Sequence, residues 1–249
     1  MRIIFQVWAA LIPLSLFLFI IFPVGILASL FKELPTRLKI VTPAWRLFGY
    51  LGLRLGCLAK IQRTDFRSAR FKVIISPALY ICNHQSLIDI PLLLAHFVIP
   101  PIMKKEIMRL PLFGIVAKAS GGMPVDRKNR GSRIKVLKMS QQRILSGFPV
   151  QYYPEGTRSK TDKPKAFEDI KARLMEFAFD NNIPVVACTV YGTNNLLTRN
   201  GMVKPFTKLG LNLAKEIYPK NFKDKEEFTR FCWGTVLKEY DRLEEKMTS

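Results

Sequence analysis

The first long stretch of the chain, residues 3–30, is almost wholly apolar and contains no Asp, Glu, Lys or Arg. It is longer than the roughly 20 residues that an α-helix needs to cross the hydrocarbon core of a bilayer. Pro13 and Pro23 lack the backbone N–H that a helix interior requires, so we expect kinks at these positions. The run therefore predicts a membrane-associated helical segment at the N-terminus.

Two arrangements fit this segment. One is a single kinked or tilted span; the other is a helical hairpin that enters one leaflet and returns, with residues 42–61 as a second membrane-associated helix. A cleaved signal peptide is disfavoured, because its apolar region would be only about 7–15 residues long. More basic residues follow the apolar run than precede it. Under the positive-inside rule, this favours a cytoplasmic location for the part of the chain that follows the run.

The charge balance indicates an anionic partner. Lysine and arginine outnumber acidic residues by 39 to 19, giving a formal net charge of +20, although 49% of the residues are hydrophobic. Nucleic acid, anionic lipid headgroups and phosphorylated small substrates all suit such a charge. The four cysteines are widely spaced, with no Cys-x-x-Cys pattern and no clustered histidines. This usage is typical of reduced thiols and predicts no structural metal.

After residue 61, strand-like and helix-like segments alternate, which indicates an α/β domain. Strands are expected within residues 71–81, 100–103, 150–153, 184–190 and 209–217, and helices over residues 132–146, 170–180 and 226–245. Shorter helices are expected to end at residues 95 and 120. We therefore predict a single α/β domain, residues 62–249, with a central mixed, mostly parallel sheet flanked by helices. It follows a membrane-embedded helical segment, residues 1–61.

Four polar clusters fall between the apolar elements of this domain. They contain His84 with Asp89, Lys104 with Glu106, residues 122–127 ending in Arg127, and residues 153–159 with Glu155, Gly156, Thr157 and Arg158. In open α/β sheets, ligands bind outside the carboxyl ends of the strands. Because these clusters follow successive strands, we expect them to form one ligand-binding site.

The residue types in these clusters suit proton transfer and anion binding. A histidine can accept a proton near neutral pH, and a carboxylate beside it fixes its tautomer. Five residues span about 500° of a regular helix, leaving side chains about 140° apart. His84 and Asp89 therefore meet only if the stretch is partly a turn, with Asp89 near a helix start. Gly156 permits close backbone approach, and Arg158 can bind phosphate oxygens through its planar fork. A capping residue beside a surface histidine, and a solvated turn over residues 153–159, are the alternative interpretations.

In order and spacing, the clusters resemble the motifs of the glycerophospholipid acyltransferases, the family of bacterial 1-acyl-glycerol-3-phosphate acyltransferases. The segment from His84 to Asp89 is similar to the family's His-x4-Asp motif, and residues 122–127 resemble its second motif. Residues 153–159 are similar to Phe-Pro-Glu-Gly-Thr-Arg-Ser, with tyrosine in place of the first phenylalanine.

Two further segments extend this resemblance over residues 71–191. Residues 104–114 resemble the family's Lys-x-Glu-Leu…Ile-Pro-x-x-Gly segment, and residues 183–186 resemble the start of Val-Pro-Ile-Ile-Pro. The chain departs from the family pattern at Ala187, where a second proline is usual, and at Arg173, where a glycine is usual. The change at Arg173 concerns the acceptor or acyl-chain pocket and leaves the His/Asp pair untouched.

The resemblance implies acyl transfer from acyl-CoA or acyl carrier protein to the sn-2 hydroxyl of 1-acyl-glycerol-3-phosphate, giving phosphatidic acid. It implies His84 as general base and Asp89 as its partner. The implied substrate-binding residues are Lys104, Arg127, Glu155, Gly156, Thr157 and Arg158. No metal or other cofactor is expected beyond the acyl donor. The expected partners are a lysophospholipid acceptor, the donor and anionic membrane lipids. The expected location is a bacterial inner membrane, with the catalytic domain on the cytoplasmic side.

Two other functions remain open. One is acylation of another lysolipid, such as a lyso-ornithine lipid or a lysophospholipid with a headgroup. The other, of a different class, is a basic membrane-tethered nucleic-acid-binding protein. The apolar N-terminus and the lack of a basic groove interleaved with aromatic residues speak against it. The remaining histidine, His96, is expected to be structural.

Overall fold

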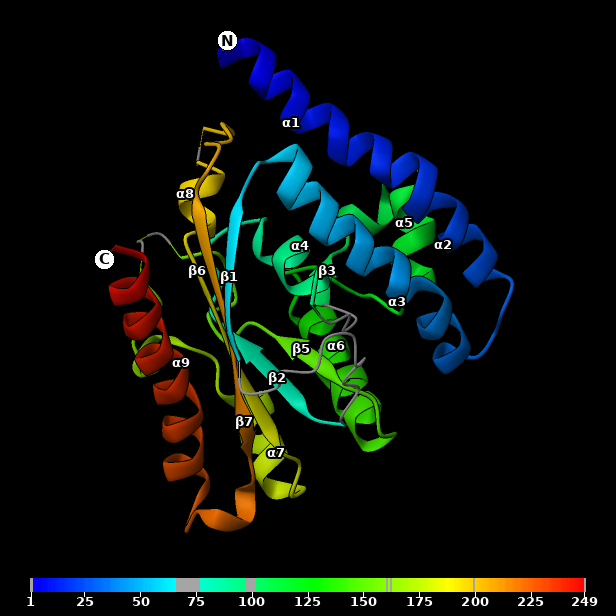
Figure 1. Ribbon diagram of the computed structural model, residues 1–249. Coiled ribbons are helices and arrows are strands. Elements are labelled where there is room, and N and C mark those ends of the chain that lie inside the picture. The colour runs from blue at the N-terminus through cyan, green and yellow to red at the C-terminus, as the bar shows by residue number, and fades with distance from the viewer. Residues whose placement is uncertain are drawn as a thin grey trace. The chain divides into compact units, whose positions relative to one another are not determined.

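The computed structural model of the chain describes residues 2–65, 77–96, 102–159, 161, 163–198 and 200–248. The chain divides into two compact units (Figure 1): Met1–Leu58 with Ile90–Ser140, and Ala59–Asp89 with Gln141–Ser249. The expected strand within residues 71–81 lies partly outside the described residues, as does the start of the one expected at residues 100–103.

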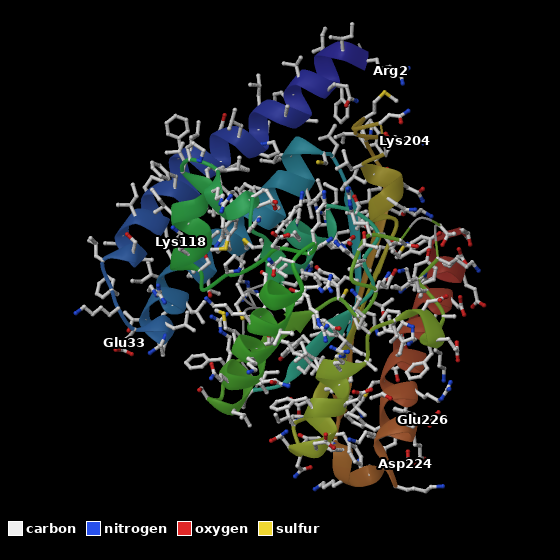
Figure 2. All side chains as sticks on the ribbon, turned by 180° about the vertical axis from the view of Figure 1, so that it is seen from behind. Arg2, Glu33, Lys118, Lys204, Asp224 and Glu226 are labelled. Atoms are coloured by element: carbon white, nitrogen blue, oxygen red, sulfur yellow. The ribbon has the colours of Figure 1, made fainter. Side chains whose placement is uncertain are left out.

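The first unit begins with one uninterrupted helical run. Helix α1 (Arg2–Leu16) continues through a π-helical turn (Phe17–Ile21) into α2 (Phe22–Ser29). Pro23 has no N–H for the helix ladder, and the π-helical turn ends just before it, with the Phe22 N–H bonded to the Phe17 carbonyl. The 28-residue run has a mean hydropathy of 2.6, which makes it long and apolar enough to cross a membrane. Figure 2 labels Arg2, the first residue of this run, and Glu33, which follows its other end.

A second helical run returns along the first, as the blue ribbons in Figure 1 show. It consists of α3 (Leu34–Leu51) and a π-helical turn (Gly52–Gly56). The Trp8 side chain donates a 2.8 Å hydrogen bond to the Leu55 carbonyl, which ties the start of the first run to the end of the second. The two runs form an antiparallel hairpin.

The second helix was predicted over residues 42–61, and these bounds are wrong. The helix starts at Leu34, because the proline that follows it suits the first turn of a helix. It ends at Gly56, and Lys60–Asp65 form a strand.

The first unit also contains a small parallel sheet of β3 (Ile102–Lys104) and β4 (Met123–Val125). Helix α5 (Phe113–Ala119) packs against α2 so closely that a Cβ on Gly25 would lie 2.7 Å from Val116 Cγ2. Trp45 of α3 donates a buried 2.7 Å hydrogen bond to Ser120, just beyond α5. The unit also contains a 3₁₀ turn (Ile107–Arg109), α4 (Asp89–Leu94) after its first residue, and α6 (Arg130–Leu145) as far as Ser140. Gly147, predicted to end α6, has a φ of +79°.

The second unit is built on a five-stranded sheet with the order β1-β7-β6-β2-β5. Its strands are β1 (Lys60–Asp65), β2 (Leu79–Cys82), β5 (Val150–Tyr152), β6 (Val185–Tyr191) and β7 (Lys208–Ile217). Strands β6 and β7 are antiparallel, and the other neighbouring pairs are parallel. The predicted fold class, a mixed and mostly parallel sheet flanked by helices, is confirmed.

Three helices accompany this sheet: α7 (Arg173–Asp180), α8 (Thr193–Leu196) and α9 (Lys225–Thr248). Helix α9, red in Figure 1, lies along β6 and β7 and buries Phe228, Trp233 and Tyr240. Short 3₁₀ turns precede α7 (Phe167–Asp169) and α9 (Pro219–Asn221). The register pairs Ile81 with both Tyr152 and Ala187, so β2, β5 and β6 run in one direction and end at the same edge. The segments that follow these strands therefore meet there.

Candidate active site

The chain turns immediately after β2 instead of entering a helix. Residues 83–88 form a loop and turn, and Asp89 is the first residue of α4. This is the local geometry that the five-residue spacing requires. His84 Nδ1 lies 2.6 Å from Asp89 Oδ2. Asp89 is fully buried, whereas His84 keeps a small exposed fraction of 7%.

Asp89 is surrounded by hydrogen-bond donors. Its Oδ2 accepts the backbone N–H groups of Gln85 at 2.8 Å and Ser86 at 3.0 Å, and its Oδ1 accepts the Thr193 hydroxyl. Donors to a carboxylate stabilise its charged form. An ionised carboxylate can only accept, so Nδ1 of His84 carries the proton of the neutral ring and Nε2 carries the lone pair.

Asn83 fixes the backbone that carries His84. Its side-chain amide donates to the Val190 carbonyl and accepts the Val190 N–H, both at 2.9 Å. Strand β2 ends at Cys82, so its backbone no longer pairs with β6 at Val190. The Asn83 side chain makes the two hydrogen bonds that a paired strand would otherwise make there. Asn83 and Val190 are both fully buried. Loss of either hydrogen bond would therefore leave a buried polar group unpaired and destabilise the folded protein.

The segment after β5 holds His84 from another direction. The rings of His84 and Tyr153 are stacked, with centroids 4.3 Å apart and planes 29° apart. The Ser159 N–H donates to the His84 carbonyl at 2.7 Å. The imidazole therefore has a set orientation before any substrate binds.

Glu155 contacts the backbone of the histidine. Its Oε1 accepts the His84 N–H at 2.9 Å. Its Oε2 is buried and has no hydrogen-bond partner among the described residues. Burial raises the pKa of this carboxyl to about 7, although the His84 N–H, the His84 charge and Lys165 act in the opposite direction. The sequence did not indicate this link between Glu155 and His84.

The rest of this segment forms a tight turn. The Gly156 N–H donates to the Tyr153 carbonyl at 3.0 Å, and Gly156 has a φ of +68°, a region that favours glycine. Thr157 and Arg158 follow and are exposed. Within the described part of the chain, no hydrogen bond or ion pair engages the Arg158 guanidinium.

Lys104 and Arg127, the other predicted binding residues, belong to the first unit. Lys104 Nζ lies 3.9 Å from Glu106 Oε2, with both side chains more than half exposed. Arg127 is exposed, and its carbonyl accepts a 2.8 Å hydrogen bond from Arg133. Next to it, Lys105 pairs with Asp126, and this bond is the largest cause of the lowered pKa of Asp126.

Sequence reasoning missed Asn83 and Thr193 as supports of the His/Asp pair. A signal for Thr193 was present, because Gly192-Thr193 follows a buried strand, as the other polar clusters do. His96, expected to be structural, has Nδ1 2.9 Å from the Leu92 carbonyl. All four cysteines are free and buried. Among the described residues, no group of His, Cys, Asp and Glu side chains could hold a metal ion.

The chain resembles known proteins in sequence. The family model described as Acyltransferase matches residues 62–191. A 1-acyl-sn-glycerol-3-phosphate acyltransferase of Cocos nucifera is 32% identical over 157 residues, covering 61% of this chain and 47% of that protein. One of Escherichia coli strain K12 is 27% identical over 174 residues, covering 67% and 66% of the two chains. The chain thus spans less than half of the Cocos nucifera relative.

A solved structure shares the fold. The crystal structure of the 1-acyl-sn-glycerophosphate (LPA) acyltransferase PlsC from Thermotoga maritima superposes with a TM-score of 0.78. The match covers 98% of this chain and 96% of that one at 22% sequence identity. The family model spans more than half of the chain and includes the His/Asp pair and the turn after β5. The chain therefore belongs to the Acyltransferase family.

Proposed function

We propose that this protein transfers a fatty acyl group from a thioester donor, acyl-CoA or acyl carrier protein, to the sn-2 hydroxyl of 1-acyl-glycerol-3-phosphate. The observation that carries the proposal is the 2.6 Å contact between His84 Nδ1 and Asp89, which leaves Nε2 free to accept a proton. This acceptor is supported by the similarity to the 1-acyl-sn-glycerol-3-phosphate acyltransferases of Cocos nucifera and Escherichia coli.

The reaction needs a base because a hydroxyl is a poor nucleophile. His84 Nε2 takes the hydroxyl proton as the oxygen attacks the thioester carbonyl, and Asp89 stabilises the imidazolium that forms. The tetrahedral intermediate collapses with formation of the C–O ester bond and loss of the C–S bond. The imidazolium returns the proton to the departing thiolate. A thiolate leaves readily, so these steps need no enzyme nucleophile, metal or redox cofactor.

The turn after β5 supplies acceptor contacts in this proposal. Arg158, exposed at the turn, binds the acceptor phosphate, and Glu155 and Thr157 position glycerol hydroxyls. A backbone amide near Gly156 stabilises the oxyanion. Lys104 and Arg127 keep the phosphate-binding role that their motifs imply.

The N-terminal hairpin supports action at a membrane. Within the most apolar 18 residues of Arg2–Ser29, only 11% are buried in the structure, so most of this apolar surface is available to lipid. We place the catalytic residues on the cytoplasmic side of a bacterial inner membrane, since basic residues dominate the end of the apolar run.

The test is an acyl-CoA assay on membranes that carry the wild type, His84→Ala or His96→Ala. With lysophosphatidic acid as acceptor, His84→Ala is expected to lose about 10²- to 10⁴-fold in thiol release, the range typical of a lost general base. His96→Ala is the matched control and is expected to retain activity. Equal activity of His84→Ala and wild type would disprove the catalytic role.

The acceptor is tested in the same assay. Activity with a lyso-ornithine lipid or a lysophospholipid with a headgroup, and none with lysophosphatidic acid, would assign the alternative acceptor. Binding of duplex DNA that weakens steeply with salt, without any acyl transfer, would favour the nucleic-acid alternative.

A further inference from the structure

Gln85 follows His84 in the turn after β2, and its backbone and side chain bind different partners. The backbone N–H donates to Asp89 Oδ2 at 2.8 Å. The side-chain Nε2 donates to the Tyr240 hydroxyl at 3.0 Å, although the two residues are 155 positions apart in the sequence. Both side chains are buried, with 6% of Gln85 and 2% of Tyr240 exposed. The turn that carries His84 is therefore tied to helix α9.

The Gln85 amide also lies beside the hydroxyl that bonds to the other oxygen of the carboxylate. Its Oε1 is 3.5 Å from Thr193 Oγ1, and Thr193 donates to Asp89 Oδ1. One side chain thus borders donors to both oxygens of Asp89. A tethered amide restricts the movement of Gln85, so its backbone N–H stays directed at Asp89. Buried hydrogen-bond networks of this kind favour one arrangement of their members.

Helix α9 gives the Tyr240 hydroxyl a fixed position. One turn before Tyr240, the Val236 carbonyl accepts the Thr189 hydroxyl of β6 at 3.3 Å. The Tyr240 ring lies against Tyr191, the last residue of β6, with centroids 5.4 Å apart. Figure 1 shows α9 running along the sheet toward the end at which α8 follows β6. Tyr240 is therefore held at the edge of the sheet where the His/Asp pair lies.

The pattern of α9 by itself indicates a core residue at this position. Val236, Tyr240, Leu243 and Met247 recur at helical spacing and are all buried. Packing explains the ring of Tyr240 but not its hydroxyl, which needs a hydrogen-bond partner when it is buried. The partner belongs to the turn that carries His84. Tyr240 itself lies outside residues 62–191, which match the family model.

We propose that Tyr240 is a positioning residue for the His84–Asp89 pair and acts through the side chain of Gln85. The inference rests on the proposed acyl transfer, in which Asp89 holds the His84 ring so that Nε2 meets the acceptor hydroxyl. Loss of the Tyr240 hydroxyl removes the tether of Gln85 and loosens the turn. Because Tyr240 supports the pair without binding substrate, this loss slows the chemical step and leaves KM unchanged.

The experiment compares wild type, Tyr240→Phe, Gln85→Leu, the double variant and Tyr218→Phe. Phenylalanine keeps the buried ring of Tyr240 and removes only its hydroxyl, and Gln85→Leu tests the same bond from its other end. Tyr218→Phe is the matched control, because it loses the same atom from an exposed side chain that donates to Glu216 at 2.6 Å. Thiol release gives kcat and KM for lysophosphatidic acid, and thermal unfolding gives Tm and the folded fraction.

We expect Tyr240→Phe to lower kcat about fivefold, the factor that one typical neutral hydrogen bond contributes, with KM within about twofold of wild type. Gln85→Leu is expected to lower kcat at least about fivefold. The double variant is expected to be no slower than Gln85→Leu, because its second change removes an interaction that is already lost. Tyr218→Phe is expected to match wild type.

The outcomes separate this inference from the proposed function. Wild type that releases no thiol with lysophosphatidic acid overturns the proposed function. Active wild type with an unchanged kcat in Tyr240→Phe overturns the positioning role, and so does a lower Tm with an unchanged kcat per folded molecule. A rise in KM at unchanged kcat also refutes it. A double variant about 25-fold slower than wild type, the product of two independent fivefold losses, shows that Tyr240 does not act through Gln85.

Discussion

The buried carboxyl of Glu155 makes the stability of this protein depend on pH in a defined direction. Burial raises its pKa from an ordinary value of 4.5 to about 7. Between these values the folded chain keeps a proton that the unfolded chain has released. The folded state therefore binds more protons, and the free energy of unfolding falls as pH rises through this window. At about 1.36 kcal/mol per pKa unit, the loss between pH 5 and pH 8 is about 2.5 kcal/mol.

Glu155→Gln removes the titration and keeps an oxygen that can accept the His84 N–H. The replacement amide has its own constant effect on stability, so the informative quantity is the change in the difference from wild type. We expect Glu155→Gln to gain about 2.5 kcal/mol relative to wild type on going from pH 5 to pH 8. For a chain of this size the gain corresponds to about 5–10 °C in Tm.

The assay is thermal unfolding followed by circular dichroism in detergent at the two pH values. Glu245→Gln is the matched control, because Glu245 lies exposed on α9 in the same unit, and it is expected to follow wild type. If the difference in Tm between Glu155→Gln and wild type is the same at both pH values, burial does not hold the proton on Glu155 and the reasoning is refuted.

Three further predictions follow from the supports of the site. Thr193→Val removes the hydroxyl that donates to Asp89 and is expected to lower kcat about tenfold at constant KM in steady-state assays; unchanged kcat would contradict this. Asn83→Ala leaves both Val190 backbone groups unpaired and should destabilise the protein by about 2–5 kcal/mol in urea unfolding, and a loss below about 1 kcal/mol would refute it. Gly192→Ala would place a Cβ 2.5 Å from the Lys208 carbonyl oxygen. It should lower Tm far more than Gly201→Ala, because Gly201 has a similar positive φ but no atom within 4 Å of the added Cβ. Equal losses of Tm would contradict the steric argument.

The His/Asp geometry was predictable because it is local. The spacing from His84 to Asp89 is short enough for helix geometry to require a turn, and the apolar run before it marks a strand. The buried strands β2 and β6 were visible as apolar segments, since both faces of their sheet are covered. Strand β1, with the sequence Lys-Ile-Gln-Arg-Thr-Asp, has no such pattern. It forms because its whole length pairs with the backbone of β7, and the local sequence does not predict this pairing.

The amino-acid sequence by itself determined the apolar N-terminal run, the alternation of strands and helices and the family motifs, because periodicity, composition and short spacings are properties of neighbouring residues. Only the tertiary structure decided which groups hold those motifs in place. Val190 binds Asn83 from 107 residues away, and Thr193 binds Asp89 from 104 residues away. Lys171 occupies the space beside Gly156 because both flank strand β5 in the folded chain. Such partners depend on sheet order and register, which are set by the packing of the whole core.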